Sequence, residues 1–494
     1  MIHLFINGKQ LLVECGDKLS AYLHIDKPCG GKGKCGKCKV LAKGGLSPMS
    51  DTEKQFLSPA EIASGIRLAC MAEVIADAEI FTLEHGENCI KTDGERIEYS
   101  LNSTIRQYGL VVDIGTTTMV VGLYKANGEM LGKTGRLNPQ TVWGADVISR
   151  IEAALNGHGT ALQHAIVKAI ENTAISLCEQ NGINVKEIDG GVFTGNTAML
   201  YLLTETPVEG LAHMPFSLVR AFGETIYAKD LGMSCFSPNM KIYLPPCISP
   251  FIGADTACAL LATSFWKRDD TFLMIDVGTN GEMVFFSHGK MYACSTAAGP
   301  AFEGAGLSCG MRGEDGAIEH ICVENGKMCL QVIGNKEPIG ICGSGVVDAV
   351  ACLIEMGQLD ETGYMEEEAE LADSVILTCK DIRSIQLAKS AIYAGITTLL
   401  KTVGVGVEEV VSFMLAGGFG GYVDLKNAGK IRLFPEKLVP RTKILGNAAY
   451  NGAVALLLDS SLKEHCKQAV LNTEVIDLSK NSIFMQEYAE GMMF

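Results

Sequence analysis

A pattern that occurs twice, in two well-separated parts of the chain, constrains the fold more than any other feature of this sequence. In each copy an apolar segment ends in an aspartate, turns on a glycine followed by hydroxyl side chains, and re-enters an apolar segment. The first copy runs Leu110-Val-Val-Asp-Ile-Gly-Thr-Thr-Thr118, and the second runs Phe272-Leu-Met-Ile-Asp-Val-Gly-Thr-Asn-Gly-Glu282. A duplication at this spacing predicts two similar lobes that close over one site.

The residue types in both copies suit a bound phosphate and a magnesium ion. Glycine turns expose backbone N–H donors to an anion, and a carboxylate at a strand end can hold Mg²⁺ and its waters. We therefore predict that Asp113 and Asp276 organise Mg²⁺ and the attacking water. The residues predicted to hold the phosphates of ATP are Gly115, Thr116, Thr117, Gly278, Thr279, Asn280 and Gly281.

Glycine-rich loops elsewhere in the chain extend this pattern. They run over residues 191–199, 340–348 and 413–421. In the last of them an apolar segment ends at Gly417, Gly418 and Phe419, which are predicted to border the adenosine. In the middle one, Gly343 and Ser344 open a helix and are predicted to approach the nucleotide. Taken singly, each such loop is more often a tight turn than a binding site.

In this order, the motifs resemble the phosphate 1, phosphate 2, adenosine and connecting motifs of the superfamily of acetate and sugar kinases, heat-shock ATPases and actin. The resemblance implies an α/β fold with two ribonuclease H-like lobes and ATP as a ligand. Asp255 and Glu282 are further candidates for orienting water, and a structural cap or ion pair is the alternative for both.

The N-terminal region carries a second site, which is a cysteine-rich loop. Cys29, Cys35 and Cys38 follow the spacing C-x5-C-x2-C, and Cys70 follows in Arg-Leu-Ala-Cys. This spacing is one residue longer than the plant-type ferredoxin run, and thiolates are the ligands that an iron–sulfur cluster requires. We therefore predict a [2Fe–2S] cluster on these four cysteines. The alternatives are inert thiols or zinc, which would normally need a second CxxC pair or a histidine.

The segments around this loop predict a small mixed fold. Residues 4–13 predict a hairpin with an Asn-Gly turn, residues 17–25 a short helix, and residues 39–42 a strand. Ser50 is expected to cap a further helix. This order resembles the β-grasp fold of [2Fe–2S] ferredoxins over residues 1–85. Cys15 lies outside the ligand set and is expected to be a buried apolar residue.

Length and composition limit the other functions. A chain of 494 residues predicts two or three domains, and its 47% hydrophobic content is typical of a packed α/β protein. Eighteen cysteines without a signal peptide indicate a reducing cytoplasm. The net charge of −16 argues against a nucleic-acid partner, and the chain has no apolar run of about 18 residues, the length that a membrane span needs.

We expect three parts: a ferredoxin-like domain at residues 1–85, a polar linker at 86–107 and a two-lobed actin-like ATPase domain at 108–494. Lobe one would take up about residues 108–265, and lobe two about residues 266–494.

Four other segments narrow the resemblance. They are residues 137–150, 244–246, 253–257 and 386–395. Together with the duplicated hairpins and the cysteine loop, they make the chain similar to the reductive activators of corrinoid proteins. That family implies an ATP-hydrolysing iron–sulfur protein that restores cob(II)amide to cob(I)amide in methyltransferase systems. Some of its members carry an extra middle domain, which the direct passage from linker to first lobe indicates is missing here.

The resemblance implies a [2Fe–2S] cluster, ATP and Mg²⁺ as cofactors. A corrinoid protein and a low-potential electron donor are the implied partners, and a homodimer stays open. Two alternatives remain. One is a small-molecule kinase of the same superfamily with a redox-sensing ferredoxin domain, and the other is an electron-delivering ferredoxin with a nucleotide switch.

Overall fold

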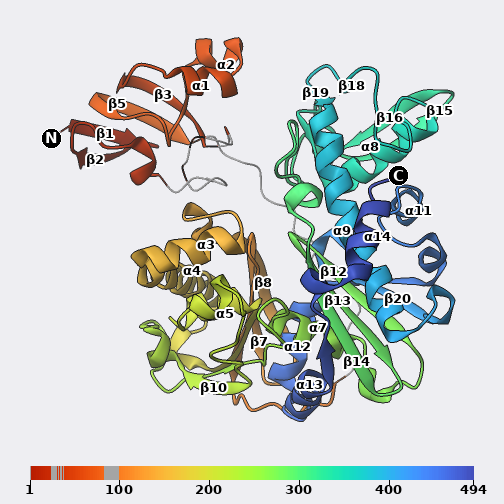
Figure 1. Ribbon diagram of the computed structural model, residues 1–494. Helices are drawn as coiled ribbons and strands as arrows, with labels where there is room; N and C mark the ends of the chain where they lie inside the picture. Colours follow the sequence, from red (N-terminus) through yellow and green to blue (C-terminus); the bar gives the residue numbers. More distant parts are fainter. Residues whose placement is uncertain (1, 24–30, 32, 34–35, 37, 83–98) are drawn as a thin grey trace.

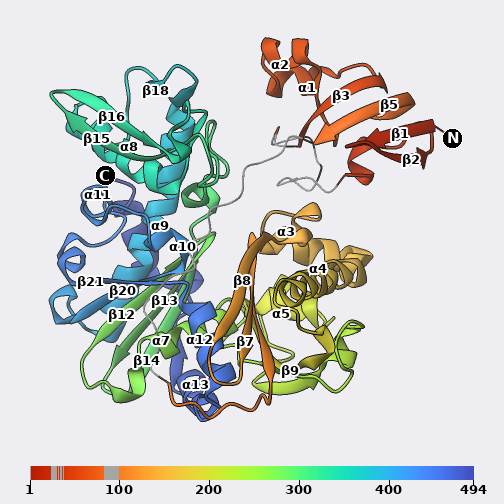
Figure 2. The same ribbon diagram turned by 180° about the vertical axis from the view of Figure 1, so that it is seen from behind.

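The computed structural model describes residues 2–23, 31, 33, 36, 38–82 and 99–494. These residues form three large sheets, and the N-terminal sheet lies apart from the other two in both views (Figures 1 and 2). Cys29, Cys35 and residues 83–98 of the predicted linker lie outside the described residues.

The N-terminal sheet has the strand order β2-β1-β5-β3-β4. Its strands are β1 (Ile2–Ile6), β2 (Lys9–Val13), β3 (Lys39–Leu46), β4 (Ile66–Leu68) and β5 (Val74–Thr82). β1 and β5 run parallel, and all other neighbours are antiparallel. Asn7 and Gly8, with φ of 48° and 80°, make the turn between β1 and β2, which confirms the predicted hairpin.

Two short helices, α1 (Asp51–Phe56) and α2 (Pro59–Ser64), connect β3 to β4. Ser50 caps α1 as predicted, because its hydroxyl accepts from the Glu53 N–H while the Glu53 carboxylate accepts from the Ser50 N–H. Glu53 is fully buried, and its carboxylate also accepts from Arg67 at 2.9 Å. This contact fastens α1 to β4.

Two predictions for this region are wrong. A helix was expected over residues 17–25, but the described part has only a 3-10 turn at Leu19–Ala21. The Leu19 N–H donates to Ala72 O, and the Val74 N–H donates to Asp17 O, so this segment bonds to the chain before β5 instead of coiling. Cys15 is exposed, because it lies in the turn that follows β2.

The second and third sheets repeat one topology. Each has three antiparallel strands in chain order, and a later strand then returns parallel to the first. The orders are β10-β11-β9-β6-β7-β8 and β21-β20-β12-β13-β14-β22. The second sheet consists of β6 (Tyr108–Ile114), β7 (Thr118–Lys125), β8 (Met130–Leu137), β9 (Ile188–Gly195), β10 (Glu224–Tyr227) and β11 (Lys241–Leu244). The third consists of β12 (Phe272–Val277), β13 (Asn280–Ser287), β14 (Lys290–Ala297), β20 (Ser412–Ala416), β21 (Thr442–Gly446) and β22 (Thr473–Val475).

Two helices lie between these sheets, α7 (Ala254–Ala262) and α12 (Ala448–Leu458). Their buried side chains form one apolar cluster with β6, β7, β12 and β13. The helices approach closely at Gly452, where an added Cβ would lie 2.0 Å from Cys258 O. Because this cluster is continuous from one sheet to the other, the two halves share a core.

Further helices cover the outer faces. The helix α4 (Gly159–Gln180) packs on the second sheet and α9 (Cys379–Val403) packs on the third, while α8 (Gly343–Glu355) packs on the small sheet that contains β15 (Figure 1). Two small sheets of the second half comprise β15 (Ala317–Glu324), β16 (Lys327–Val332) and β17 (Gly340–Ile341), and β18 (Ala369–Ala372) and β19 (Val375–Leu377). The remaining α-helices are α3 (Val147–Ala153), α5 (Thr197–Leu203), α6 (Glu209–Ala212), α10 (Gly417–Gly420), α11 (Leu425–Lys430), α13 (Leu462–Leu471) and α14 (Ser482–Glu490).

The described end of the predicted linker packs on α12. Ser100 N–H donates to Asp459 at 3.0 Å, Ser103 donates to Leu457 O at 2.8 Å, and the side chain of Ile105 is buried. Among the described helices, none combines the length and apolar character needed to span a membrane.

Candidate functional site

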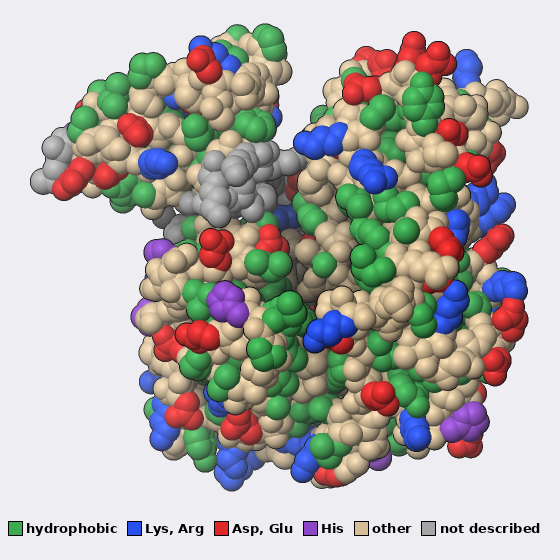
Figure 3. Space-filling view, in the orientation of Figure 1, with side chains coloured by type: hydrophobic (Ala, Val, Ile, Leu, Met, Phe, Trp, Pro, Cys, Tyr) green, Lys and Arg blue, Asp and Glu red, His purple; other side chains and the backbone are tan. Residues whose placement is uncertain are grey.

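The two predicted hairpin tips meet at a single carboxylate. The Thr117 hydroxyl, between β6 and β7, donates to Glu303 Oε2 at 3.2 Å. The Thr279 hydroxyl, between β12 and β13, donates to Glu303 Oε1 at 2.9 Å. On the face drawn in Figure 3, the surface is hollowed between the two halves of the molecule. The carboxylate of Glu303 therefore bridges the tips of both copies of the sequence pattern.

The first tip is held by its carbonyl groups. Asn138 donates to Gly115 O through its side chain at 2.8 Å and to Thr117 O through its backbone at 2.9 Å, and Arg150 donates to Thr116 O. No acceptor for the N–H groups of Thr116 and Thr117 is found among the described residues. With the carbonyls occupied, the tip presents donors that suit an anion.

The second tip is a tighter turn. Gly278 N–H donates to Asn280 O at 2.9 Å, and Gly299 N–H donates to Thr279 O at 2.9 Å. Gly281 is buried, and an added Cβ would lie 3.2 Å from the Thr296 side chain. Gly278 and Thr279 thus form a compact turn beside Glu303, and Asn280 and Gly281 begin β13.

Four acidic side chains gather behind the tips. Burial and the charge of Asp255 raise the pKa of Asp113 to about 7, although a hydrogen bond with Asn447 acts to lower it. Burial and the charges of Asp255 and Asp113 raise the pKa of Asp276 to about 7 as well. The pKa of Asp255 rises to about 6, and that of Glu282 rises well above its ordinary value, chiefly through burial. Carboxylates that repel one another in this way favour a bound cation.

Gly417 lies directly against this acidic group. Its φ is +82°, and an added Cβ would lie 2.2 Å from Asp276 Oδ1. Gly418 is exposed with open space around it, and the Phe419 ring packs on Phe302 with 5.4 Å between ring centroids. The predicted adenosine loop therefore adjoins both Asp276 and the segment that carries Glu303. Its contact with adenosine stays a prediction.

The other predicted nucleotide loop is packed inside the second half. An added Cβ on Gly343 would lie 1.8 Å from Phe302 O. Ser344 is buried, and its hydroxyl donates to Glu319 O at 2.9 Å. The structure thus brings Gly343 next to the segment that carries Glu303, while the Ser344 hydroxyl bonds within the fold. The approach of both residues to a nucleotide stays a prediction.

Two of the four predicted cluster ligands are brought together. Cys38 Sγ and Cys70 Sγ are 3.2 Å apart, and both cysteines are buried. The hydrogen bond from Cys38 lowers the pKa of the Cys70 thiol to about 6, although burial of the thiol acts to raise it. Gly31, Gly33 and Gly36 wrap nearby with φ of 78°, 70° and 64°. Two adjoining thiols in a glycine-rich loop, one of them with a lowered pKa, fit an iron–sulfur cluster.

The segment around Gln386 and Lys389 has a structural role. Gln386 donates to Met492 O at 2.8 Å, and Lys389 donates to Gly491 O at 2.8 Å and to Met493 O. Burial lowers the pKa of Lys389 to about 7. These polar side chains of α9 hold the C-terminal end of the chain.

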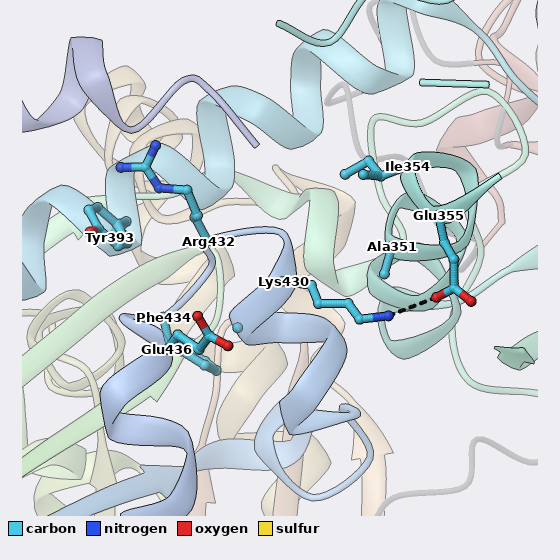
Figure 4. A pocket seen from close by; sticks show the side chains of 9 residues that line it. Ala351, Ile354, Glu355, Tyr393, Lys430, Arg432, Phe434 and Glu436 are labelled. Atoms are coloured by element: carbon cyan, nitrogen blue, oxygen red, sulfur yellow. Dashed lines mark hydrogen bonds and ion pairs between the residues drawn. The ribbon is translucent and has the colours of Figure 1, made fainter. Parts of the chain in front are cut away.

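A cavity of about 560 Å³ lies at the other end of α8 (Figure 4). It is lined by Glu355, Tyr393 and Arg432 among others, and Lys430 pairs with Glu355 at 2.8 Å. Glu355 ends the helix that Gly343 begins, so about 18 Å of helix separates this cavity from Gly343. It is not part of the predicted site.

Two family models match this chain. The one described as the C-terminal domain of RACo, the ASKHA domain, matches residues 270–494, and the one described as the RACo middle region matches residues 108–268. The corrinoid activation enzyme RamQ of Eubacterium limosum is 35% identical over 457 residues, which cover 84% of this chain and 76% of that protein. The chain belongs to the RACo family of corrinoid-protein activators.

Two other proteins are similar to this chain over most of its length. The [Co(II) methylated amine-specific corrinoid protein] reductase of Methanosarcina barkeri is 25% identical over 72% of this chain and 70% of its own length. A solved structure titled as a reductive activator for corrinoid, iron-sulfur protein covers 100% of this chain and 98% of its own, with a TM-score of 0.71 and 26% identity. The predicted family and the actin-like α/β fold of the C-terminal part are confirmed.

One prediction about the RACo family is wrong. The sequence indicated that the middle domain of some members is missing, yet the middle-region model matches residues 108–268. This match ends between α7 and β12, so it spans the half of the molecule built on the second sheet. The middle region carries the first copy of the duplicated hairpin, which is why its sequence pattern looked like a first ATPase lobe.

Sequence reasoning also missed Glu303. The residue lies in Gly299-Pro-Ala-Phe-Glu-Gly304, and the only local signal is an acid within a glycine-rich segment. Asn138 and Arg150 were noted as part of a family pattern, but their bonds to the first tip were not foreseen.

Proposed function

We propose that this protein is an ATP-dependent reductive activator that passes one electron from a [2Fe–2S] cluster to a corrinoid protein, converting cob(II)amide to cob(I)amide for methyl transfer. The observation that carries the proposal is the meeting of Thr117 and Thr279 at Glu303 in a chain of this family. RamQ and the M. barkeri reductase are named for corrinoid activation and corrinoid-protein reduction.

The N-terminal sheet is proposed to be a β-grasp ferredoxin domain over residues 1–85, joined by a linker at 86–107 to the actin-like part at 108–494. Cys29, Cys35, Cys38 and Cys70 would hold the cluster. The buried contact between Cys38 and Cys70 supports this assignment. All described cysteines are free thiols, which supports a reducing compartment such as the cytoplasm.

Asp113 and Asp276 are proposed to hold Mg²⁺ and orient the attacking water. The mutual repulsion of these half-buried carboxylates supports a cation there. The donors of the two tips would hold the phosphates. A phosphate and the Glu303 carboxylate would compete for the hydroxyls of Thr117 and Thr279, so nucleotide binding would move Glu303 and draw the two halves onto one ligand.

We expect the cob(II)/cob(I) couple of the corrinoid partner to lie below the potential of the cluster, so the electron transfer would be uphill and would gain from ATP. Plant-type [2Fe–2S] clusters have a reduction potential of roughly −400 mV, and related clusters reach higher potentials. Each 100 mV of uphill transfer costs one electron about 2.3 kcal/mol. A potential difference of about 100 to 200 mV can be overcome by a nucleotide-driven cycle that shifts a conformational equilibrium. A low-potential donor would supply the electron.

The test uses the cluster-loaded protein, a cob(II)amide corrinoid protein and a reductant too weak to reduce the cobalt alone, under strict anoxia. We expect the cob(I)amide absorbance to accumulate only after Mg·ATP is added. A non-hydrolysable analogue should not sustain multiple turnovers. Equal reduction with and without ATP would reject the activator and leave an electron-delivering ferredoxin with a nucleotide switch. A phosphorylated sugar or carboxylic acid would favour a kinase.

A further inference from the structure

A second pair of facing thiols lies on a hairpin of the C-terminal half. The strands β15 and β16 are antiparallel, and Asn325 and Gly326, with φ of 51° and 76°, make the turn between them. In this register Cys322 lies directly opposite Cys329. Neighbouring side chains on one face of an antiparallel pair lie close enough to interact.

Packing of the hairpin fixes which face the thiols occupy. Ile321 is buried in the core of the C-terminal half, and Val323, Met328 and Leu330 pack against that core. Cys322, Glu324 and Cys329 alternate with these residues and are exposed. Since side chains alternate between the faces of a strand, burying the apolar set places both thiols and the carboxylate on the outer face.

The geometry of these three side chains suits a metal ion. Cys322 Sγ, Cys329 Sγ and a Glu324 carboxylate oxygen all lie within 4.8 Å of one another, and Cys322 Sγ is 4.0 Å from Glu324 Oε1. A tetrahedral zinc site needs about 3.8 Å between its sulfurs. Within the described part of the chain, this is the one group of three or more histidine, cysteine or acidic side chains that converges so closely.

A histidine lies next to this group on the same strand. His320 is two residues before Cys322, and its Nδ1 is 3.0 Å from Asp348 Oδ2. Such a bond to a carboxylate fixes the ring and leaves Nε2 as the nitrogen able to bind a ligand. His320 and both cysteines also line a cavity of about 560 Å³, together with Asp348 of α8 and Lys430 of α11.

We propose that Cys322, Cys329 and Glu324 bind one thiophilic divalent cation of the zinc class. Thiolates select soft and borderline metals, whereas Mg²⁺ and Ca²⁺ prefer oxygen ligands. Binding releases the two thiol protons and changes no oxidation state. The ion would clamp the hairpin β15–β16, which projects from the C-terminal half away from the N-terminal sheet (Figure 1).

The test uses Co²⁺ as a spectroscopic probe on the reduced, cluster-loaded full chain under anoxia. The wild-type protein is compared with Cys322→Ser and with Cys379→Ser, which removes another exposed thiol far along the sequence. We expect one additional equivalent of Co²⁺ and a thiolate-to-cobalt charge-transfer band in wild type and Cys379→Ser, and neither in Cys322→Ser. Glu324→Gln should keep the band and weaken binding by about 10- to 100-fold.

Equal Co²⁺ uptake by wild type and Cys322→Ser would overturn the proposal. A Cys322–Cys329 disulfide found by mass spectrometry in protein kept anoxic throughout would overturn it as well. All compared proteins contain the same N-terminal cysteines, so their difference spectrum is independent of whether those cysteines hold a cluster. Failure of this site and failure of the proposed activator function are therefore distinguishable.

Discussion

Thr117 and Thr279, on the tips of two different sheets, donate to the two oxygens of one carboxylate, that of Glu303. Their hydroxyls were both predicted to hold phosphate, and Glu303 accepts from them at 3.2 and 2.9 Å. An acidic side chain at this point links the two halves directly. It also competes with any anion that uses the same donors.

Replacing Glu303 with Gln should strengthen Mg·ADP binding. The amide removes a negative charge from the donors that would hold phosphate, and we expect a gain of about 1 kcal/mol, or roughly fivefold in Kd. Isothermal titration calorimetry measures this. Glu319→Gln is the control, because the Glu319 carboxylate instead accepts from Gln331 in an exposed pair on the hairpin. Weaker binding by Glu303→Gln would mean that Glu303 helps to hold the ligand.

Replacing Asp276 with Asn should leave ATP binding but abolish hydrolysis. The amide preserves the size of the side chain and removes the charge that would hold Mg²⁺, so we expect turnover to fall at least about 100-fold. The same change should stabilise the metal-free protein, since it relieves repulsion with Asp255 and Asp113. Phosphate release and thermal melting measure the two effects. Wild-type turnover would show that the catalytic carboxylate is elsewhere.

The half-buried carboxylates should make stability and metal binding depend on pH in opposite directions. Burial raises the pKa of Asp113 and Asp276 from 3.8 to about 7, so between these values the folded state holds more protons than the unfolded state. The free energy of unfolding of the metal-free protein should therefore fall as pH rises from about 4 to about 7. Mg·nucleotide binding near pH 6.5 should release protons.

Calorimetry in two buffers of different ionisation enthalpy measures that proton release, and denaturant unfolding across the pH range measures the stability. Asp276→Asn is expected to release fewer protons than wild type. Identical heats in both buffers would contradict the assignment of Mg²⁺ to these carboxylates.

Replacing Cys38 with Ala should abolish the [2Fe–2S] spectrum and leave nucleotide binding intact. Cys38 lies 3.2 Å from Cys70 in the N-terminal core, whereas the hairpin tips belong to other sheets. Iron and sulfide per chain, the visible spectrum and Mg·ADP affinity are the measurements. Cys15→Ser, an exposed thiol of the same region, should keep full iron content. Two irons and two sulfides retained in Cys38→Ala would refute the ligand set.

Replacing Lys389 with Met should loosen the C-terminal end. The variant loses the buried hydrogen bonds to Gly491 O and Met493 O, and we expect a loss of about 2 kcal/mol in the free energy of unfolding. Lys380→Met, at an exposed position of the same helix, is the matched control. Equal chemical-denaturation midpoints for the two variants would show that the tail does not depend on Lys389.

Much of the local structure could be predicted because short-range chemistry decides it. The Asn7-Gly8 turn, the Ser50 cap and the strand-end aspartates all follow from residues within a few positions of one another. The failures have a different source. The helix expected over residues 17–25 is replaced by bonds to residues near Ala72, which no local pattern reveals. The middle region passed unnoticed because it carries a copy of the same hairpin.

The sequence by itself determined that two similar hairpins would each present a carboxylate, a glycine turn and hydroxyls, since these depend on residue type and spacing. Only the tertiary structure decided which groups face one another. Glu303 reaches Thr117 across 186 positions of chain, and Lys389 reaches Gly491 O across 102 positions. Such long-range contacts depend on how sheets and helices pack to bury apolar surface, and that packing is a property of the whole chain.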